Sequence, residues 1–431
     1  MIFLAHGVGQ VFESPIPVYL YLLGAAATVL VSFGVRTIVA EAPAPLIDRE
    51  VGGPGLARAV SVALRVAGLG GLVLVVVAGV IVGSEGFTVA TLGFWVGLFV
   101  GVTMLSALLS GAWEAMDPWA YLEEVYRAED PPELVRVPHW WLGPITVFAL
   151  FWFELVSERG FEDWGVLAAL LAYTVYALSL RSQYGENWRY ADPFGILFGF
   201  AARCAPFRLR SERIWLKNPL ADLDEPRPMP LALYASVFVL LGSTTFDNLR
   251  ETVGWGEFLT ATNLDALPTM LLDSISLLAL GVLFWIPFVG SVLLARRLIA
   301  RDRPWSDLER WFGWGLVPIG IAYVVAHNVP LLISGAPLLL RELSDPFAQD
   351  WNIIGTANLW EGFAPSPALI WGIEIAVIVG GHILGVMAAH RTAYRLGGTH
   401  SLAVKSTYAL TGLMAVYTIT TLWLLSQPLV A

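Results

Sequence analysis

The sequence is poor in cysteine and in lysine. Its single cysteine, Cys204, excludes an internal disulfide bond and any metal site built from several cysteines. The two lysines, Lys217 and Lys405, and the formal net charge of −10 argue against nucleic-acid binding, because nucleic acids are bound by basic surfaces. The first ten residues lack the basic start and long apolar run of a secretory signal peptide, so we expect none.

Charged residues of both signs are also scarce. Only 14% of the 431 residues are charged and 57% are hydrophobic, whereas a soluble domain has about 25% charged residues. The mean hydropathy is +0.67. This composition indicates one helical bundle in a lipid bilayer and not the two or three soluble domains that the length alone would suggest.

Long apolar segments recur along the chain. A helix of about 20 mainly apolar residues crosses a bilayer core of about 30 Å. We expect ten such spans in a single integral membrane domain that comprises residues 1–431. They lie near 18–40, 59–83, 90–113, 140–157, 163–180, 230–246, 268–299, 312–335, 366–391 and 403–428. The seventh contains Pro287, which predicts a kink or a tilt.

The basic residues predict the orientation of these spans. If the N-terminus is outside, the cytoplasmic connections and the adjoining span ends contain 22 of the 25 Lys and Arg residues. Only Arg159, Arg250 and Arg341 then lie outside. Lys and Arg are enriched in the cytoplasmic loops of membrane proteins. The sequence therefore predicts an all-α bundle in the plasma membrane with both termini outside.

The cytoplasmic connection 181–229 contains a shorter apolar segment. Phe194–Phe207 is apolar but too short to cross the bilayer. We expect it to form a helix at the membrane interface or a re-entrant helix.

Two copies of one motif mark predicted helix starts. Segments 113–119 and 188–194 both read Trp, three residues, then Asp-Pro-aromatic. Asp accepts hydrogen bonds from the free N–H groups at a helix start, and Pro suits the first helical position. We therefore expect Asp117 and Asp192 to cap helices. An anion or substrate site at these helix starts is the alternative. A third Asp-Pro-aromatic sequence begins at Asp345 in a predicted external loop.

Polar and ionisable side chains occur inside several predicted spans. A charge at the bilayer centre costs roughly 2.5 kcal/mol or more, so such residues are candidates for function. The candidate substrate- or ion-binding residues are Asp247, Asp273, His327, Asn328, Glu374 and His382. In the predicted topology, four of them come from spans 6 to 9 and fall in the outer half of the membrane: Asp247, Asp273, His327 and Glu374.

Two candidates have neighbours that favour a site. Pro330 removes a helical hydrogen bond beside His327, and loosened backbone at membrane depth is tolerated mainly where it lines protein or a cavity. Three glycines close to His382 allow another helix or a ligand to approach. The structural alternatives are a proline kink near the outer interface and a buried histidine that bonds to a neighbouring helix.

Short motifs along the whole chain also occur in a characteristic order. They are Ala5-His6-Gly7 with Pro15-Ile16-Pro17, Asp117-Pro118-Trp119, Phe153-Glu154-Leu155, Asp192-Pro193-Phe194, Phe246-Asp247, Ala326-His327, Gly381-His382 and Ala389-His390. This set resembles a family of bacterial and archaeal multi-span membrane proteins that is commonly labelled fenitrothion hydrolase. The label implies hydrolysis of an organophosphate ester.

Three functions are consistent with these features. The first is a transporter or permease for a small solute or ion, in which Asp273, Glu374 and His382 carry protons or bind a cation. The second is a membrane-embedded hydrolase with a divalent metal ion held by His327, His382 and Asp247. The third is a non-catalytic subunit that anchors a partner in a membrane complex. The lipid bilayer is a partner in all three.

Overall fold

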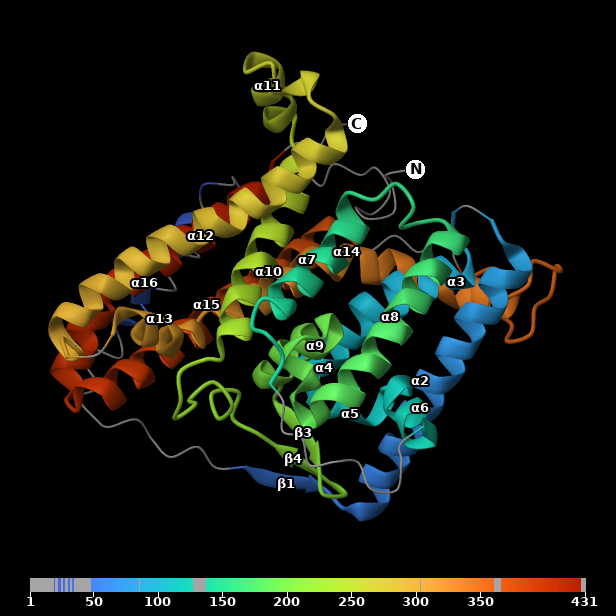
Figure 1. The fold of residues 1–431 in the computed structure, drawn as a ribbon, viewed down its shortest axis with the longest axis horizontal. Coiled ribbons are helices and arrows are strands. Elements are labelled where there is room, and N and C mark those ends of the chain that lie inside the picture. The colour runs from blue at the N-terminus through green and yellow to red at the C-terminus, as the bar shows by residue number, and fades with distance from the viewer. Residues whose placement is uncertain are drawn as a thin grey trace. The chain divides into compact units, whose positions relative to one another are not determined.

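The computed structural model consists almost entirely of helices (Figure 1). It describes Tyr19, 22–24, 26–27, 30–31, 33–34, 48–84, 86–126, 137–302, 304–359 and 366–427. These residues form two compact units. The first unit contains the described residues of 48–217 and 328–359, and the second unit contains those of 19–34, 218–327 and 366–427.

Seven helical segments among the described residues are long and apolar enough to cross a membrane. They are Pro54–Val82, Val89–Leu108, Asp163–Cys204, Thr269–Ile299, Val317–Ser344, Ala368–Gly397 and His400–Leu424. The chain is therefore a multi-pass membrane protein of the all-α class, as the sequence predicts. The count of ten spans, their orientation and the plasma membrane stay predictions. Most of the first predicted span, 18–40, lies outside the described residues.

Two predicted spans correspond to helices that are not among these seven. The predicted span 140–157 is α7 (Leu142–Leu155), which has 14 residues and is shorter than a full crossing. The predicted span 230–246 is α10 (Leu231–Arg250), whose last two turns are rich in polar residues.

The helices of the first unit range from 4 residues in α3 to 29 residues in α2. Besides α7, these are α2 (Pro54–Val82), α3 (Val89–Leu92), the π-helix η2 (Gly93–Val102), α4 (Thr103–Leu108), α5 (Ala112–Met116), α6 (Pro118–Tyr126), α8 (Asp163–Tyr184), the 3₁₀ helix η3 (Gly185–Tyr190) and α9 (Pro193–Cys204). Helix α2 packs against α5 and α8, and α9 packs against α4 and α7 (Figure 1). Helix α9 covers much of the predicted segment Phe194–Phe207; its position at a membrane interface stays a prediction.

The first unit also contains a small sheet that the sequence did not predict. Its strand order is β1 (Arg49–Gly52), β4 (Arg213–Leu216), β3 (Phe207–Arg210) and β2 (Leu109–Ser110). Strands β3 and β4 form a hairpin, β1 pairs antiparallel with β4, and β2 pairs parallel with β3. Ser211 and Glu212 form the hairpin turn at φ 51° and 57°, as a two-residue turn with left-handed residues requires.

The two Asp-Pro motifs begin helices as predicted. Asp117 accepts hydrogen bonds from two backbone N–H groups in the first turn of α6. Asp192 caps α9 by accepting from the backbone N–H of Gly195, with Pro193 at the first helical position. Asp345 differs, because its carboxylate accepts backbone hydrogen bonds in a turn and not at a helix start.

The helices of the second unit range from 3 residues in η4 to 31 residues in α12. They are α10, α11 (Val253–Ala261), the 3₁₀ helix η4 (Leu264–Ala266), α12 (Thr269–Ile299), α13 (Trp305–Gly313), α15 (Pro367–Gly397) and α16 (His400–Leu425). Helix α12 packs against both α10 and α16, and α15 packs against α16 (Figure 1). Helix α14 (Val317–Ser344) contributes residues 317–327 to this unit and 328–344 to the first unit.

Glycines allow close contacts between helices of the second unit. A Cβ atom added to Gly385 of α15 would lie 2.6 Å from the carbonyl oxygen of Gly315, just before α14. One added to Gly381 would meet the Pro318 carbonyl oxygen and Ala322 of α14. Two of the three glycines near His382, Gly381 and Gly385, therefore serve the packing of α15 against the start of α14.

Candidate functional site

Asp247 and His327 form a buried pair in the second unit. Asp247 is in the last turn of α10, and His327 is in α14. His327 Nε2 lies 2.6 Å from Asp247 Oδ2, and the two side chains are only 10% and 7% exposed. The structure thus brings together two of the residues that the sequence identified as candidates.

Asn248 determines which nitrogen of His327 carries a hydrogen. Its amide N–H₂ donates to the carbonyl oxygen of Thr244 at 2.8 Å and to the hydroxyl of Tyr323 at 3.1 Å. Its Oδ1 therefore accepts from His327 Nδ1, at 3.2 Å, so Nδ1 is protonated. Because Nε2 faces a carboxylate oxygen, one further proton lies in that 2.6 Å contact, on Nε2 or on Asp247.

A positively charged side chain lies beside Asp247. Arg250 Nε lies 3.5 Å from Asp247 Oδ1, one turn further along α10. Arg250 also interacts electrostatically with Asp273, near the start of α12. Asp247 and His327 thus belong to one polar network with Arg250 and Asn248, and the charge of Arg250 also acts on Asp273.

Two other candidates, Glu374 and His382, are buried in α15. Glu374 makes no hydrogen bond with the part of the chain that the structure describes, although it is only 6% exposed. His382 is 1% exposed, and its Nδ1 donates to the carbonyl oxygen of Ile378 at 2.9 Å. Its Nε2 therefore presents a lone pair that meets no donor among the described residues. Neither side chain hydrogen-bonds to Asp247 or His327.

The described residues contain no group of three or more His, Cys, Asp or Glu side chains that could hold a metal ion. The set proposed for a metal, His327, His382 and Asp247, is therefore not gathered into one site. Asn328 is buried and directly follows His327 in α14, and it is the first residue of α14 that belongs to the first unit.

Sequence reasoning missed three residues of the polar network. Asn248 directly follows Asp247, and Arg250 lies three residues after it, so both share the polar end of α10. Tyr323 lies four residues before His327 and therefore on the same face of α14. That helical spacing is the signal that would have identified Tyr323.

The two Asp-Pro motifs meet around α8 in the first unit. Arg181 Nη2 lies 2.5 Å from Asp117 Oδ2, and the Tyr173 hydroxyl donates to Asp192 Oδ2 at 2.8 Å. The guanidinium group of Arg181 also lies 3.9 Å from the centre of the Trp188 ring. Because Asp117 neutralises Arg181, this cluster favours the structural interpretation of the motifs over an anion site.

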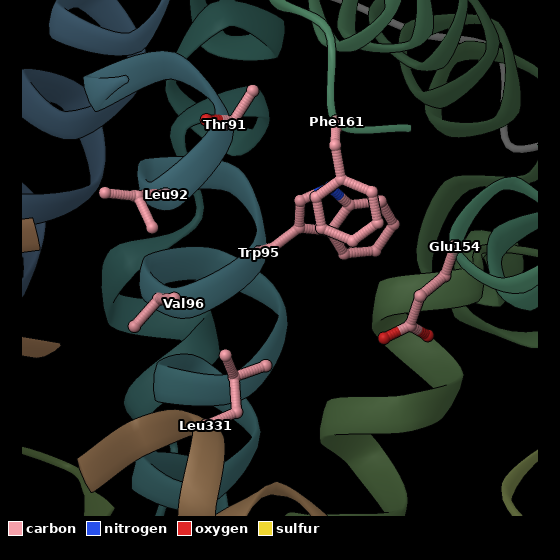
Figure 2. Close-up of a pocket in the computed structure, with 7 residues that line it drawn as sticks. All are labelled: Thr91, Leu92, Trp95, Val96, Glu154, Phe161 and Leu331. Carbon is pink, nitrogen blue, oxygen red and sulfur yellow. The ribbon is translucent and has the colours of Figure 1, made fainter. Parts of the chain in front are cut away.

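A small pocket in the first unit contains one carboxylate. Figure 2 shows Glu154 of α7 facing the segment that carries Trp95 and Val96. Trp95 Nε1 donates to the Gly160 carbonyl oxygen at 2.6 Å, and its ring lies 5.7 Å from that of Phe161. Apart from Thr91 and Glu154 the lining is apolar. The pocket therefore offers one acid and no second titratable group.

No family model, curated protein or solved structure matches this chain. The resemblance to the proteins labelled fenitrothion hydrolase accordingly stays a prediction, and the residues of the second unit carry the functional argument.

Proposed function

We propose that the protein is a transporter or permease that couples the movement of a small solute or ion to a proton, and that Asp247 and His327 bind this proton. The observation that carries the proposal is the buried 2.6 Å contact between an acid and a base on two different helices. Buried ionisable pairs in multi-pass proteins typically mark ion or proton pathways.

Separation of α10 and α14 would release the proton. In the closed pair, the proton is shared between His327 Nε2 and Asp247. When the helices separate, Asp247 keeps Arg250 as an ion-pair partner, and the shared proton loses one of the two groups that hold it. Pro330 lacks a backbone N–H one turn after His327, so α14 bends there at low cost.

In this proposal, Glu374 and His382 are the groups that bind the transported species. Each is buried, and each offers an oxygen or nitrogen lone pair that the described residues leave unused. A carboxylate and an imidazole bind a small cation or relay a proton. A small solute or ion is the substrate class that this pair of groups supports.

Proton flux in proteoliposomes tests the proposal. Vesicles with an internal pH-sensitive dye receive a gradient of NaCl, KCl or ZnCl₂, and internal pH is followed. We expect a cation-driven pH change with the wild-type protein, and a fall to the level of empty vesicles for Asp247→Asn and His327→Gln. Asp307→Asn, at an exposed ion pair with Arg310, is the control and retains the flux. Wild-type flux in both pair variants would exclude the pair as the proton site.

Hydrolysis of an organophosphate ester is the second candidate function. The same pair supplies a carboxylate that orients a histidine, as in the general base of many hydrolases, and this role requires the substrate to displace Asn248 from His327 Nδ1. Purified protein is incubated with a nitrophenyl phosphorothioate ester, with and without Zn²⁺, and nitrophenolate release is recorded. Release that His327→Gln abolishes supports this function, and a rate equal to that of buffer excludes it.

A further inference from the structure

Four arginines line one open hollow in the first unit, the arginine hollow. Its volume of about 660 Å³ is within the size range of small-molecule sites. Arg58 comes from α2, Arg189 from η3, and Arg208 and Arg210 from β3. Arg58, Arg189 and Arg210 are exposed, so their side chains are accessible to a ligand.

The small sheet places two of these arginines on one face. Side chains alternate between the two faces of a strand, so Arg208 and Arg210 project from the same face of β3. Strand β3 pairs with β4, and β4 packs against α2, the helix that carries Arg58 (Figure 1). The tertiary structure thus gathers arginines from segments that are far apart in the sequence.

The arginine hollow has more positive than negative charge. Arg208 is already neutralised, because its Nη1 lies 2.8 Å from Asp48 Oδ2. The other three arginines form no ion pair with the part of the chain that the structure describes. Two acids, Glu114 and Glu212, also line the hollow, so four arginines and two glutamates give the lining a net charge of +2. The hollow therefore favours an anionic ligand.

The side chains of the lining favour a phosphate group over a carboxylate. A guanidinium group stays charged at all physiological pH values and donates two parallel N–H bonds to a phosphate or a carboxylate. A tetrahedral phosphate accepts such bonds from several directions, whereas a carboxylate has only two oxygens in one plane. Ser110 and Ser211 add hydroxyl groups to the same lining.

The bilayer is a direct source of such a group. Arg58 lies near the start of α2, which is long and apolar enough to cross a membrane. Val62 and Val66 follow it at intervals of four residues and therefore share its face of the helix. These two side chains are 53% and 65% exposed, so a stripe of accessible apolar surface begins one turn from the arginine. In the predicted topology this end of α2 is cytoplasmic, and anionic lipids are concentrated in the cytoplasmic leaflet.

We propose that the arginine hollow binds the phosphate headgroup of an anionic phospholipid. The phosphate accepts hydrogen bonds from Arg58, Arg189 and Arg210, and an acyl chain lies on the outer face of α2 along Val62 and Val66. The lipid needs no passage through the protein, because both the arginines and the two valines are exposed. This site is independent of the proposed proton-coupled transport.

Native mass spectrometry of the protein in detergent tests the site. The protein is titrated with dioleoyl phosphatidylglycerol, dioleoyl phosphatidylcholine or inorganic phosphate, and the bound molecules are counted. We expect phosphatidylglycerol to bind more tightly than phosphatidylcholine. Arg58→Gln and Arg210→Gln each weaken phosphatidylglycerol binding about fivefold, as the loss of one basic contact predicts. Arg213→Gln is the matched control, because Arg213 is exposed on the same sheet but pairs with Glu50 and does not line the hollow. It retains the affinity.

Glu114→Gln provides a test that misfolding cannot imitate. It removes a negative charge from the arginine hollow, so the affinity for phosphatidylglycerol rises by up to about fivefold while that for phosphatidylcholine stays constant. Equal effects of Arg210→Gln and Arg213→Gln, or equal affinity of the wild type for the two lipids, overturn the proposal. Binding of inorganic phosphate without a preference for phosphatidylglycerol identifies a soluble anion as the ligand and overturns the lipid assignment. All readouts are independent of proton flux.

Discussion

Asp247 and His327 depend on each other in the interior of the second unit. Removal of one partner leaves the other buried without its 2.6 Å contact, whereas removal of both eliminates the unpaired group. We therefore predict that Asp247→Ala and His327→Ala destabilise the protein less together than the sum of their separate effects, with a coupling energy of about 0.5–3 kcal/mol. Thermal unfolding of the two single variants and the double variant in detergent measures this energy. Strict additivity would contradict the contact.

Glu309 is a buried carboxyl group of α13 with a defined hydrogen-bond network. The Tyr234 hydroxyl donates to Glu309 Oε2 at 2.9 Å, and Trp285 Nε1 donates to that hydroxyl at 3.2 Å. Burial raises the pKa of Glu309 above its ordinary value of 4.5, and the hydrogen bond from Tyr234 opposes part of this rise. The fold therefore favours the protonated carboxyl group.

This pKa shift predicts a pH-dependent effect of Glu309→Gln. Between the ordinary and the raised pKa, the folded state binds more protons than the unfolded state, so the contribution of Glu309 to stability falls as pH rises above 4.5. The amide of the variant does not ionise and still offers Tyr234 an acceptor oxygen. We expect the melting temperature of Glu309→Gln, relative to wild type, to increase as pH rises above 4.5. A constant difference across pH would show that the carboxyl group titrates normally.

Among the elements, α10 and α12 cross where two glycines meet. A Cβ atom added to Gly242 of α10 would lie 2.5 Å from the backbone nitrogen of Gly281 in α12 and 2.8 Å from its Cα. Backbone atoms cannot move aside as a flexible side chain can, so the whole helix must shift. Asp247 lies on α10 one to two turns beyond this crossing, so a shift of α10 would also move the Asp247 carboxylate.

We predict that Gly242→Ala destabilises the protein by about 1–3 kcal/mol, as overpacking does. Gly290→Ala, in α12, is the matched control because an added Cβ atom there has no atom within 4 Å. Since alanine favours helix over glycine, this control is neutral or stabilising by up to about 1 kcal/mol. Unfolding of both variants in the same detergent gives the comparison, and equal effects would refute close contact at Gly242.

For the molecule as a whole, the predicted orientation is open to a direct test. Cys204 is first replaced by serine, and single cysteines are then introduced at Ser211 and Gln349, both of which are exposed. The segregation of basic residues predicts that a membrane-impermeant maleimide labels position 349 but not position 211 in intact cells. Both positions react after lysis. Labelling of position 211 from outside would reverse the predicted topology.

Much of the membrane architecture followed from local features of the chain. The length of their apolar segments predicts helices such as α2, α12 and α15, because a membrane span is recognised from its own length and hydropathy without knowledge of its neighbours. The caps at Asp117 and Asp192 are equally local. The four-stranded sheet was not predictable, because it pairs strands as short as two residues from distant parts of the sequence.

The amino-acid sequence by itself determined that the chain is an all-α membrane protein with polar groups in several of its apolar helices. Only the tertiary structure decided which of these groups meet: Asp247 pairs directly with His327, which also bonds to Asn248, whereas Glu374 and His382 stay outside that network. The reason is geometric. Position along an apolar segment predicts a residue's depth in the membrane, but the rotation of each helix about its own axis, set by packing, decides which side chains face each other.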